Sequence, residues 1–267
     1  VYIHAGGFDK ADGRFGEDTI RFDKTGSAVW VDLEYDGPQA WTRGGSNLNS
    51  GTWREVADIQ DFEIIGGSPF DDNLRGAAGD NTFLYTGGFD IIDGRDGVDT
   101  VDFSAFDAPI WVGQWGSAYE AWTTDGGDLD SGARRLRARM TNVEKIIGTQ
   151  FGDEHHADSG DNTFLYKGGQ PSSFGDAQPR TGGFDQIDGG DGFDIVDFSN
   201  FGDAIWVDLG VASVVQQWDY PEPDIDRFEV VDDLAVAARA GSGLPGDGIP
   251  FNDGDFLDDY FDDNDFD

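Results

Sequence analysis

The chain has 267 residues and carries 54 acidic and 17 basic side chains, a formal net charge of −37. So many unbalanced carboxylates repel nucleic acid and anionic membranes, and they favour a neutralising partner such as a hard divalent cation. Aromatic residues at 13% and hydrophobic residues at 37% are too frequent for a disordered acidic chain. The sequence has no cysteine, which excludes disulfides and thiolate metal sites, and no stretch approaches the roughly 20 apolar residues that a membrane span needs.

The sequence repeats itself over a long period, since residues 6–20 (GGFDKADGRFGEDTI) match residues 87–101 (GGFDIIDGRDGVDTV). The same spacing would start a third copy at Gly168, but the match begins at Gly182 and covers residues 182–196. This delay predicts an insert, with residues 170–181 projecting as a loop and the repeat resuming at Gly182. The chain therefore holds about three copies of one unit. Because the first copy begins partway through the unit, we expect this sequence to belong to a longer array.

Within each copy runs a second period, of nine residues. In the second copy the nonapeptides begin at Gly67, Gly76, Tyr85 and Gly94. The fourth position is glycine in eight of ten nonapeptides, and the eighth is apolar in all but one, where His155 stands. The sixth position is always an acid or its amide: Asp9, Asp18, Asp72, Asn81, Asp90, Asp99, Asp153, Asn162, Asp185 and Asp194.

The spacing predicts how these side chains stack. Nine residues make one turn and one short strand, so two nonapeptides complete a coil of about 18 residues and equivalent turns lie one above another. The expected pairs are Asp72 with Asp90, Asn81 with Asp99, Asp153 with Asp185 and Asn162 with Asp194, while the partners of Asp9 and Asp18 are expected upstream of Val1. The alternative is that the Asp-Gly runs are turns without a metal, although such turns need no fixed register.

The pattern resembles the RTX nonapeptide G-G-x-G-x-D-x-U-x, a calcium-binding repeat of secreted bacterial proteins. Residues 94–102 (GRDGVDTVD) and 189–197 (GGDGFDIVD) match it best, and residues 142–148 and 198–209 resemble the segments that separate RTX blocks. The resemblance covers about residues 6–233. It implies an all-β fold, a right-handed parallel β-roll or β-helix solenoid of about three units. It also implies that calcium is held by the sixth-position side chains and the turn carbonyls of neighbouring turns.

Four parts of the chain are expected from this organisation. Residues 1–66 hold a partial block with connecting strands, residues 67–147 a full block with connecting strands, and residues 148–233 a block with the insert and a shorter connection. Residues 234–267 form an acidic tail, for which a disordered tail, further calcium-binding loops and part of an export signal are the alternatives.

The segments between blocks alternate apolar and polar residues, which predicts strands. Such strands are expected at residues 28–33 (AVWVDL), 109–112 (PIWV), 204–209 (AIWVDL), 58–65 (DIQDFEII) and 142–147 (NVEKII). An I-I-G sequence at residues 64–66 and 146–148 suggests equivalent positions there. Only residues 232–239 (DDLAVAAR) are compatible with a helix.

Two other groups of side chains invite a functional interpretation. Trp30, Trp111 and Trp206 are equivalent, as are Trp41, Trp122 and, more loosely, Trp218. They either stack on sugars or, as we favour, cap or line the solenoid where calcium turns are absent. The arginines Arg134, Arg135, Arg137 and Arg139 either bind an acidic surface such as a neighbouring copy or form a solvated face that balances nearby acids; the latter is favoured. His155 and His156 are read as packing or surface residues rather than a transition-metal site.

No catalytic motif is present, so we expect no enzyme activity in this chain. The leading hypothesis is a calcium-binding structural or adhesive region of a secreted or cell-surface bacterial protein, of the adhesin, filament or surface-layer type. It would be exported through a type I secretion system and fold on extracellular calcium. Its expected partners are Ca²⁺ and, as candidates, neighbouring copies or surface glycans; no nucleic acid and no membrane span are expected. The alternative is the accessory domain of a secreted lipase, protease or alginate epimerase whose catalytic domain lies elsewhere.

Overall fold

The structure is a computed structural model. It describes residues 1–115, 118–124, 129, 132–157, 160–166, 185–190, 193–199, 228–231 and 234–237. All regular secondary structure in these ranges is β-strand, which confirms the all-β prediction. A search of the same ranges finds no helix with the length and apolarity to cross a membrane.

Within the described residues the strands form two sheets. Sheet A has nine strands in spatial order: β1 (Tyr2–Ile3), β3 (Thr19–Arg21), β7 (Ile64–Gly66), β9 (Thr82–Leu84), β11 (Thr100–Asp102), β15 (Lys145–Ile147), β17 (Thr163–Leu165), β19 (Asp194–Asp197) and β21 (Leu234–Ala237). Sheet B has twelve: β2 (Asp9–Asp12), β6 (Arg54–Gln60), β5 (Ala40–Thr42), β4 (Val29–Asp32), β8 (Asn73–Arg75), β10 (Asp90–Asp93), β14 (Arg134–Thr141), β13 (Ala118–Thr124), β12 (Trp111–Trp115), β16 (Glu154–His156), β18 (Asp185–Asp188) and β20 (Phe228–Val231).

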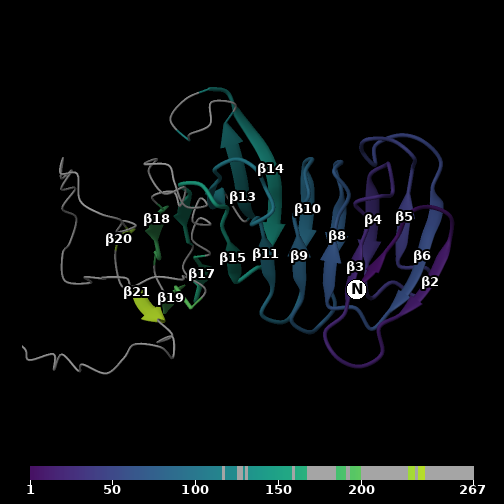
Figure 1. Cartoon of the computed structure of the whole chain (residues 1–267), viewed down its shortest axis with the longest axis horizontal. Helices are drawn as coiled ribbons and strands as arrows, with labels where there is room; N and C mark the ends of the chain where they lie inside the picture. Colours follow the sequence, from purple (N-terminus) through teal and green to yellow (C-terminus); the bar gives the residue numbers. More distant parts are fainter. Residues whose placement is uncertain are drawn as a thin grey trace, which may run out of the picture.

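Within a block the chain alternates between the two sheets. Strands β7, β9 and β11 lie in sheet A, and β8 and β10 lie between them along the chain but in sheet B. Neighbouring strands pair in parallel, and paired residues are two nonapeptides apart, as when Thr82 pairs with Thr100 and Asn73 with Ile91. Figure 1 shows these short strands side by side along the long axis of the molecule. Two nonapeptides therefore make one coil, as their spacing predicts.

The eighth position of each nonapeptide points between the sheets, because successive residues of a strand face opposite sides. Leu74, Phe83, Ile92 and Val101 come alternately from sheets B and A, and each is at most 1% exposed. Burial of each such side chain stabilises the fold by about 1.5–3 kcal/mol. The regular alternation of one buried residue per strand explains how strands of three or four residues are sufficient.

Between blocks, three antiparallel strands replace the single strand of sheet B. Strands β4, β5 and β6 form one such insertion and β12, β13 and β14 the other, with β13 and β14 extending beyond their neighbours in Figure 1. The inner faces are closed by small or branched residues such as Val31, Ala40 and Val112, all fully buried. The outer faces carry tryptophans that lie directly opposite each other across the strands, Trp30 with Trp41 and Trp111 with Trp122.

These four tryptophans therefore cover the outer face of the inserted strands and do not point between the sheets. They alternate with fully buried neighbours and lie half-buried on the outside, where Trp30 meets the ring of Tyr35 edge-on at 5.4 Å. The ring of Trp111 lies 5.7 Å from that of His156 in strand β16, so these contacts agree with the favoured interpretation that the tryptophans pack on the solenoid where calcium turns are absent. Trp206 and Trp218 lie outside the described residues.

Three details of the predicted elements need correction. The apparent helix at residues 232–239 contains strand β21, which pairs in parallel with β19, so non-local pairing overrides the local pattern. The predicted strand at residues 58–65 is two strands, β6 and β7, joined by a turn. The I-I-G alignment is one residue out of register, since Ile64 and Lys145 occupy equivalent positions opposite Thr82 and Thr163. The predicted loop at residues 170–181 and the strand at residues 204–209 lie outside the described residues.

Candidate calcium-binding turns

All four predicted pairs of sixth-position residues are stacked, and the same hydrogen bond joins each pair. The backbone N–H of one residue donates to Oδ1 of the residue one coil later. The distances are 2.9 Å for Asp72 to Asp90, 2.8 Å for Asn81 to Asp99, 2.8 Å for Asp153 to Asp185 and 2.9 Å for Asn162 to Asp194. The last two pairs are further apart along the chain than the first two yet make the same bond, so the coil resumes in register after the insert.

These eight side chains are buried within the turns, each at most 6% exposed. In the turns that a glycine opens, the carboxylate folds back over that glycine. A Cβ atom at Gly94 would lie 2.4 Å from Asp99 Oδ2, and one at Gly67 would lie 2.6 Å from Asp72 Oδ2. A side chain at either glycine would therefore fill the space that the carboxylate occupies, whereas Asp90 is buried in a turn that Tyr85 opens.

The first turn of each block satisfies its carboxylate with protein donors. Asp72 accepts hydrogen bonds from Val29 N–H at 2.7 Å, Ser68 O–H at 2.7 Å and Ser68 N–H at 2.5 Å. In the next copy Asp153 accepts the matching three from Ile110 and Thr149. These carboxylates thus hold the turn together without a metal.

Sequence reasoning missed the roles of Ser68 and Thr149. The available signal was that each is a hydroxyl residue two positions before a phenylalanine, Phe70 or Phe151, that replaces the fourth-position glycine. Those phenylalanines mark the opening turns, and their backbone N–H groups donate to the same hydroxyls.

Turns further into the block are different. Oδ2 of Asp90 and Oδ2 of Asp99 are buried and have no hydrogen-bond partner, although these residues are 1% and 0% exposed. An unpartnered buried carboxylate oxygen costs several times more than an ordinary lost hydrogen bond unless it is protonated or meets a cation. A cation bound beside Asp90 or Asp99 would therefore stabilise the folded chain more than one bound at the first turn of a block.

The pKa values of these carboxyls are raised because burying a charged carboxylate is unfavourable. Burial raises the pKa of Asp72 and that of Asp153 to about 7, against the donors that lower it. Burial, with the nearby Asp72 carboxylate, raises the pKa of Asp90 well above its ordinary value. Burial raises the pKa of Asp99 to about 6, with repulsion from Glu144 adding to the shift. A bound cation would act in the opposite direction on all of them.

Asp9 and Asp18 have other surroundings in the described chain. Oδ2 of Asp9 lies 2.7 Å from His4 Nδ1, and its side chain is 31% exposed. Asp9 pairs with Ala57 in strand β6, so no second sixth-position residue follows it in sheet B. Asp18 donates its backbone N–H to Glu63 Oε2 at 2.9 Å.

Glu63 and Glu144 are the acidic residues that the nonapeptide pattern did not reveal. Asp99 donates its backbone N–H to Glu144 Oε2 at 2.8 Å, as Asp18 does to Glu63. Each glutamate ends a three-residue turn that begins with a residue of positive φ, Asp61 or Asn142. The glutamates therefore continue the sixth-position column across the segments between blocks. The only sequence signal was that the two glutamates occupy equivalent positions in successive copies.

The fit to calcium can be judged from these oxygens. Calcium takes six to eight oxygen ligands, and the stacked turns offer unpartnered carboxylate oxygens at Asp90 and Asp99. Within the described ranges no three or more His, Asp or Glu side chains converge on one point. Backbone carbonyls of the turns are further oxygen donors that calcium could use.

The remaining candidate residues occupy structural positions. His155 fills an eighth position in the core, 3% exposed, with its ring 5.2 Å from Phe164. His156 lies on the surface 2.7 Å from Glu154. In strand β14, Arg139 pairs with Glu120 at 2.6 Å, in keeping with an arginine face that balances nearby acids.

No protein-family model matches the chain, and no curated protein is similar enough in sequence to count as a relative. The RTX resemblance therefore rests on the spacing of residues and on the turns described above.

Proposed function

We propose that this chain is a calcium-binding structural or adhesive repeat region of a secreted or cell-surface bacterial protein. Its coils would form a right-handed RTX-type solenoid of about three units that folds on extracellular calcium. The observation that supports this most is the pair of buried, unpartnered carboxylate oxygens at Asp90 and Asp99. They lie in turns stacked at the spacing that the nonapeptides set, and their pKa values are raised by burial.

Calcium would act by stabilising the folded state alone. An ion that binds the folded chain and not the unfolded chain adds RT ln(1 + [L]/Kd) to stability, and several sites add together. Extracellular calcium modules have Kd values of about 10⁻⁴–10⁻³ M, far above cytosolic calcium. At cytosolic calcium and growth temperature the blocks would therefore stay largely unfolded, which suits export of an unfolded chain through a type I secretion system, and they would fold outside. The calcium-free chain would melt at a much lower temperature, so a scan in EGTA that starts in the cold still records its transition.

Circular dichroism and thermal melts in EGTA and in millimolar calcium test the proposal. We expect a large rise in melting temperature with calcium, and Asp90→Ala and Asp185→Ala should each raise the calcium midpoint. Asp36→Ala, which changes an exposed acid, is the matched control and should leave the midpoint unchanged. Equal melting with and without calcium would show that the turns are held by the protein alone.

The adhesive part of the proposal has its own test. Purified chain is examined by electron microscopy before and after addition of calcium, and it is also applied to a glycan array. Assembly into fibres or sheets supports neighbouring copies as partners, and glycan binding supports a surface sugar. If neither is observed, the adhesive role is rejected and calcium binding alone is retained.

A further inference from the structure

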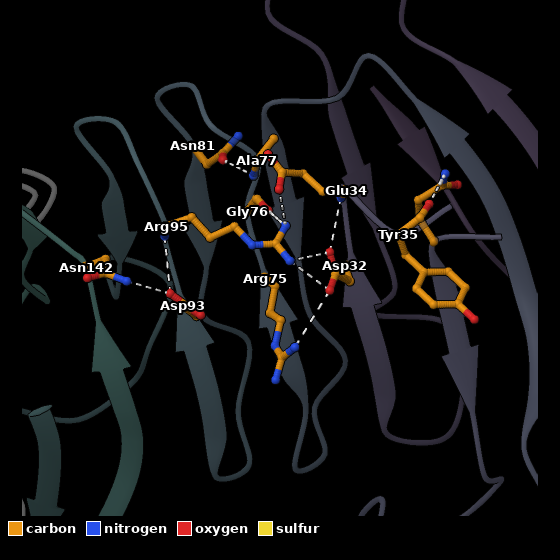
Figure 2. Close-up of polar contacts among 11 residues, drawn as sticks. Asp32, Glu34, Tyr35, Arg75, Gly76, Ala77, Asn81, Asp93, Arg95 and Asn142 are labelled. Carbon is orange, nitrogen blue, oxygen red and sulfur yellow. Dashed lines mark hydrogen bonds and ion pairs between the residues drawn. The ribbon is translucent and has the colours of Figure 1, made fainter. Parts of the chain in front are cut away.

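One arginine of the first complete block, Arg95, also contacts the segment that precedes the block, in addition to the backbone pairing of β4 with β8. Figure 2 shows the Arg95 side chain reaching across strand β8 toward Asp32 and Glu34. Its Nη1 donates to the carbonyl of Gly76 and lies 3.4 Å from Glu34 Oε2. Its Nη2 lies 2.8 Å from Asp32 Oδ1 and 2.9 Å from Asp32 Oδ2. The guanidinium is thus surrounded by four oxygens from three residues of two separate segments.

This set of oxygens resembles the ligands of a hard cation. A turn carbonyl, a bidentate carboxylate and a second carboxylate are the donor types that calcium uses. Asp32 is only 5% exposed, so its charge needs a partner. Acids also line the adjoining surface hollow of about 350 Å³, where Asp93 and Asp96 join Glu34 and Arg95. Arg75 is a weaker neighbour, 3.8 Å from Asp32 and 43% exposed.

The backbone of Arg95 shows that the position would otherwise suit glycine. Its φ is +74°, and Gly190, the equivalent residue of the third copy, has the same value. A non-glycine residue in this conformation costs about 1 kcal/mol. The contacts of Arg95 offset this cost, whereas Arg14, at the equivalent position with a φ of +67°, is largely exposed.

The second connection between blocks lacks both halves of this contact. One copy later, Gly190 stands at the position of Arg95 and Gly113 stands at the position of Asp32. The cation and the buried acid are therefore present together at the first connection and absent together at the second. An arginine kept only for solubility would not follow the acid in this way.

We propose that Arg95 is a resident cation: it fills an oxygen-lined cation site formed by Gly76, Asp32 and Glu34, and so holds the connection between residues 22–66 and the first complete block without calcium. The connection at Gly113 has neither the cation nor the buried acid. The second half of the inference is that calcium can occupy the site at the first connection once Arg95 is removed, and this half rests on the proposed calcium function.

Arg95→Gln in the full chain tests the inference by thermal melts in EGTA and in millimolar calcium chloride, with sodium chloride at equal ionic strength as a control for screening. In EGTA we expect the melting temperature to fall by roughly 5–10 °C, because Asp32 keeps its buried charge without its main partner. In calcium most of this loss should be recovered, and calorimetric titration should show one more bound calcium than in the unmodified chain. Arg14→Gln is the matched control, since Arg14 is the equivalent residue one copy earlier, 77% exposed and 3.6 Å from Asp12, and it should change neither measurement.

The double variant Asp32→Asn with Arg95→Gln keeps the test decisive if the single variant unfolds. It removes the buried charge of Asp32, which Arg95→Gln leaves without its main partner, and should therefore melt at a higher temperature than Arg95→Gln in EGTA. If Arg95→Gln melts at the same temperature as the unmodified chain in EGTA, Arg95 does not hold the connection to the block. A loss in EGTA that calcium does not recover would refute the cation site and leave Arg95 a packing residue. If calcium does not raise the melting temperature of the unmodified chain, the proposed function fails. The measurements in EGTA still show whether Arg95 holds the connection to the block.

Discussion

The two oxygens of the Asp90 carboxylate have different surroundings. Oδ1 accepts the Asp72 N–H, and Oδ2 is buried without a partner. Asp90→Asn keeps the acceptor and removes the buried charge, whose pKa burial raises. At pH 8 in EGTA the melting temperature should therefore rise, while the gain on adding calcium should shrink because a ligand charge is lost. Differential scanning calorimetry in both buffers measures the two effects.

Asp72 offers the opposite case within the same stack. The Asp72 carboxylate accepts three hydrogen bonds from protein donors. In Asp72→Asn, the side-chain amide N–H would therefore face an N–H or O–H of Ser68 or Val29. We expect a loss of about 1–3 kcal/mol in unfolding free energy, of similar size with and without calcium. A loss that appears only in calcium would instead make Asp72 a metal ligand.

Protonation of the buried carboxylates should stabilise the folded chain in part as calcium would. Folded-state pKa values of about 7 for Asp72 and Asp153 and about 6 for Asp99 lie above the unfolded value near 3.9. The folded chain then binds more protons than the unfolded chain, so its stability rises as the pH falls. In EGTA the melting temperature should increase from pH 8 to pH 6.5.

Below pH 6.5 His155 acts in the opposite direction. Burial lowers its pKa to about 3, whereas the unfolded imidazole protonates near 6.5, so stability is lost as the pH falls from 6.5 toward 3. His155→Leu should extend the acid stabilisation to lower pH. A melting temperature in EGTA that falls from pH 8 to 6.5 would contradict the carboxyl assignments.

Among the turns, two fourth-position glycines have very different requirements. Gly88 has a φ of +89°, and a Cβ there would lie 2.3 Å from the Phe70 carbonyl oxygen in the coil before. Gly79, in the neighbouring turn, has no atom within 4 Å of such a Cβ. Gly88→Ala should cost more than about 2 kcal/mol and Gly79→Ala less than about 0.5 kcal/mol, in denaturant unfolding with saturating calcium. Equal costs would mean that close stacking of turns does not limit the fold.

The nonapeptide strands could be predicted from sequence because two periods agree there. The nine-residue period sets the turns, and the apolar residue at the eighth position of each nonapeptide sets which side of the strand faces inward. The segments between blocks carry only alternation, which fits a parallel or an antiparallel strand equally well. The order of β4, β5 and β6 therefore could not be predicted, since it depends on which neighbours each strand meets.

The candidate site divides in the same way. The stacked pairs followed from the spacing, whereas Ser68, Thr149, Glu63 and Glu144 lie outside the sixth positions and act through bonds between coils. The sequence did not single out Arg95, because the second position of the nonapeptide varies from one nonapeptide to the next. The acidic partners of Arg95 come from strand β4 and the turn that follows it, far earlier in the chain, and became identifiable only once β4 was placed beside β8.

At the scale of the whole molecule, the two sheets differ in length. Among the described residues, sheet B has twelve strands and sheet A has nine. Each of the two insertions adds two strands to sheet B, which would otherwise have eight. At a strand spacing of about 4.8 Å, each insertion adds about 10 Å to one side of the molecule and nothing to the other. Each unit is thus a wedge, and wedges placed end to end follow an arc. Several units in tandem should appear by electron microscopy as curved rods with sheet A on the concave side, rather than as straight ones. Curvature, and with it the shape of any larger array, would then be encoded in the two extra strands rather than in the metal-binding turns.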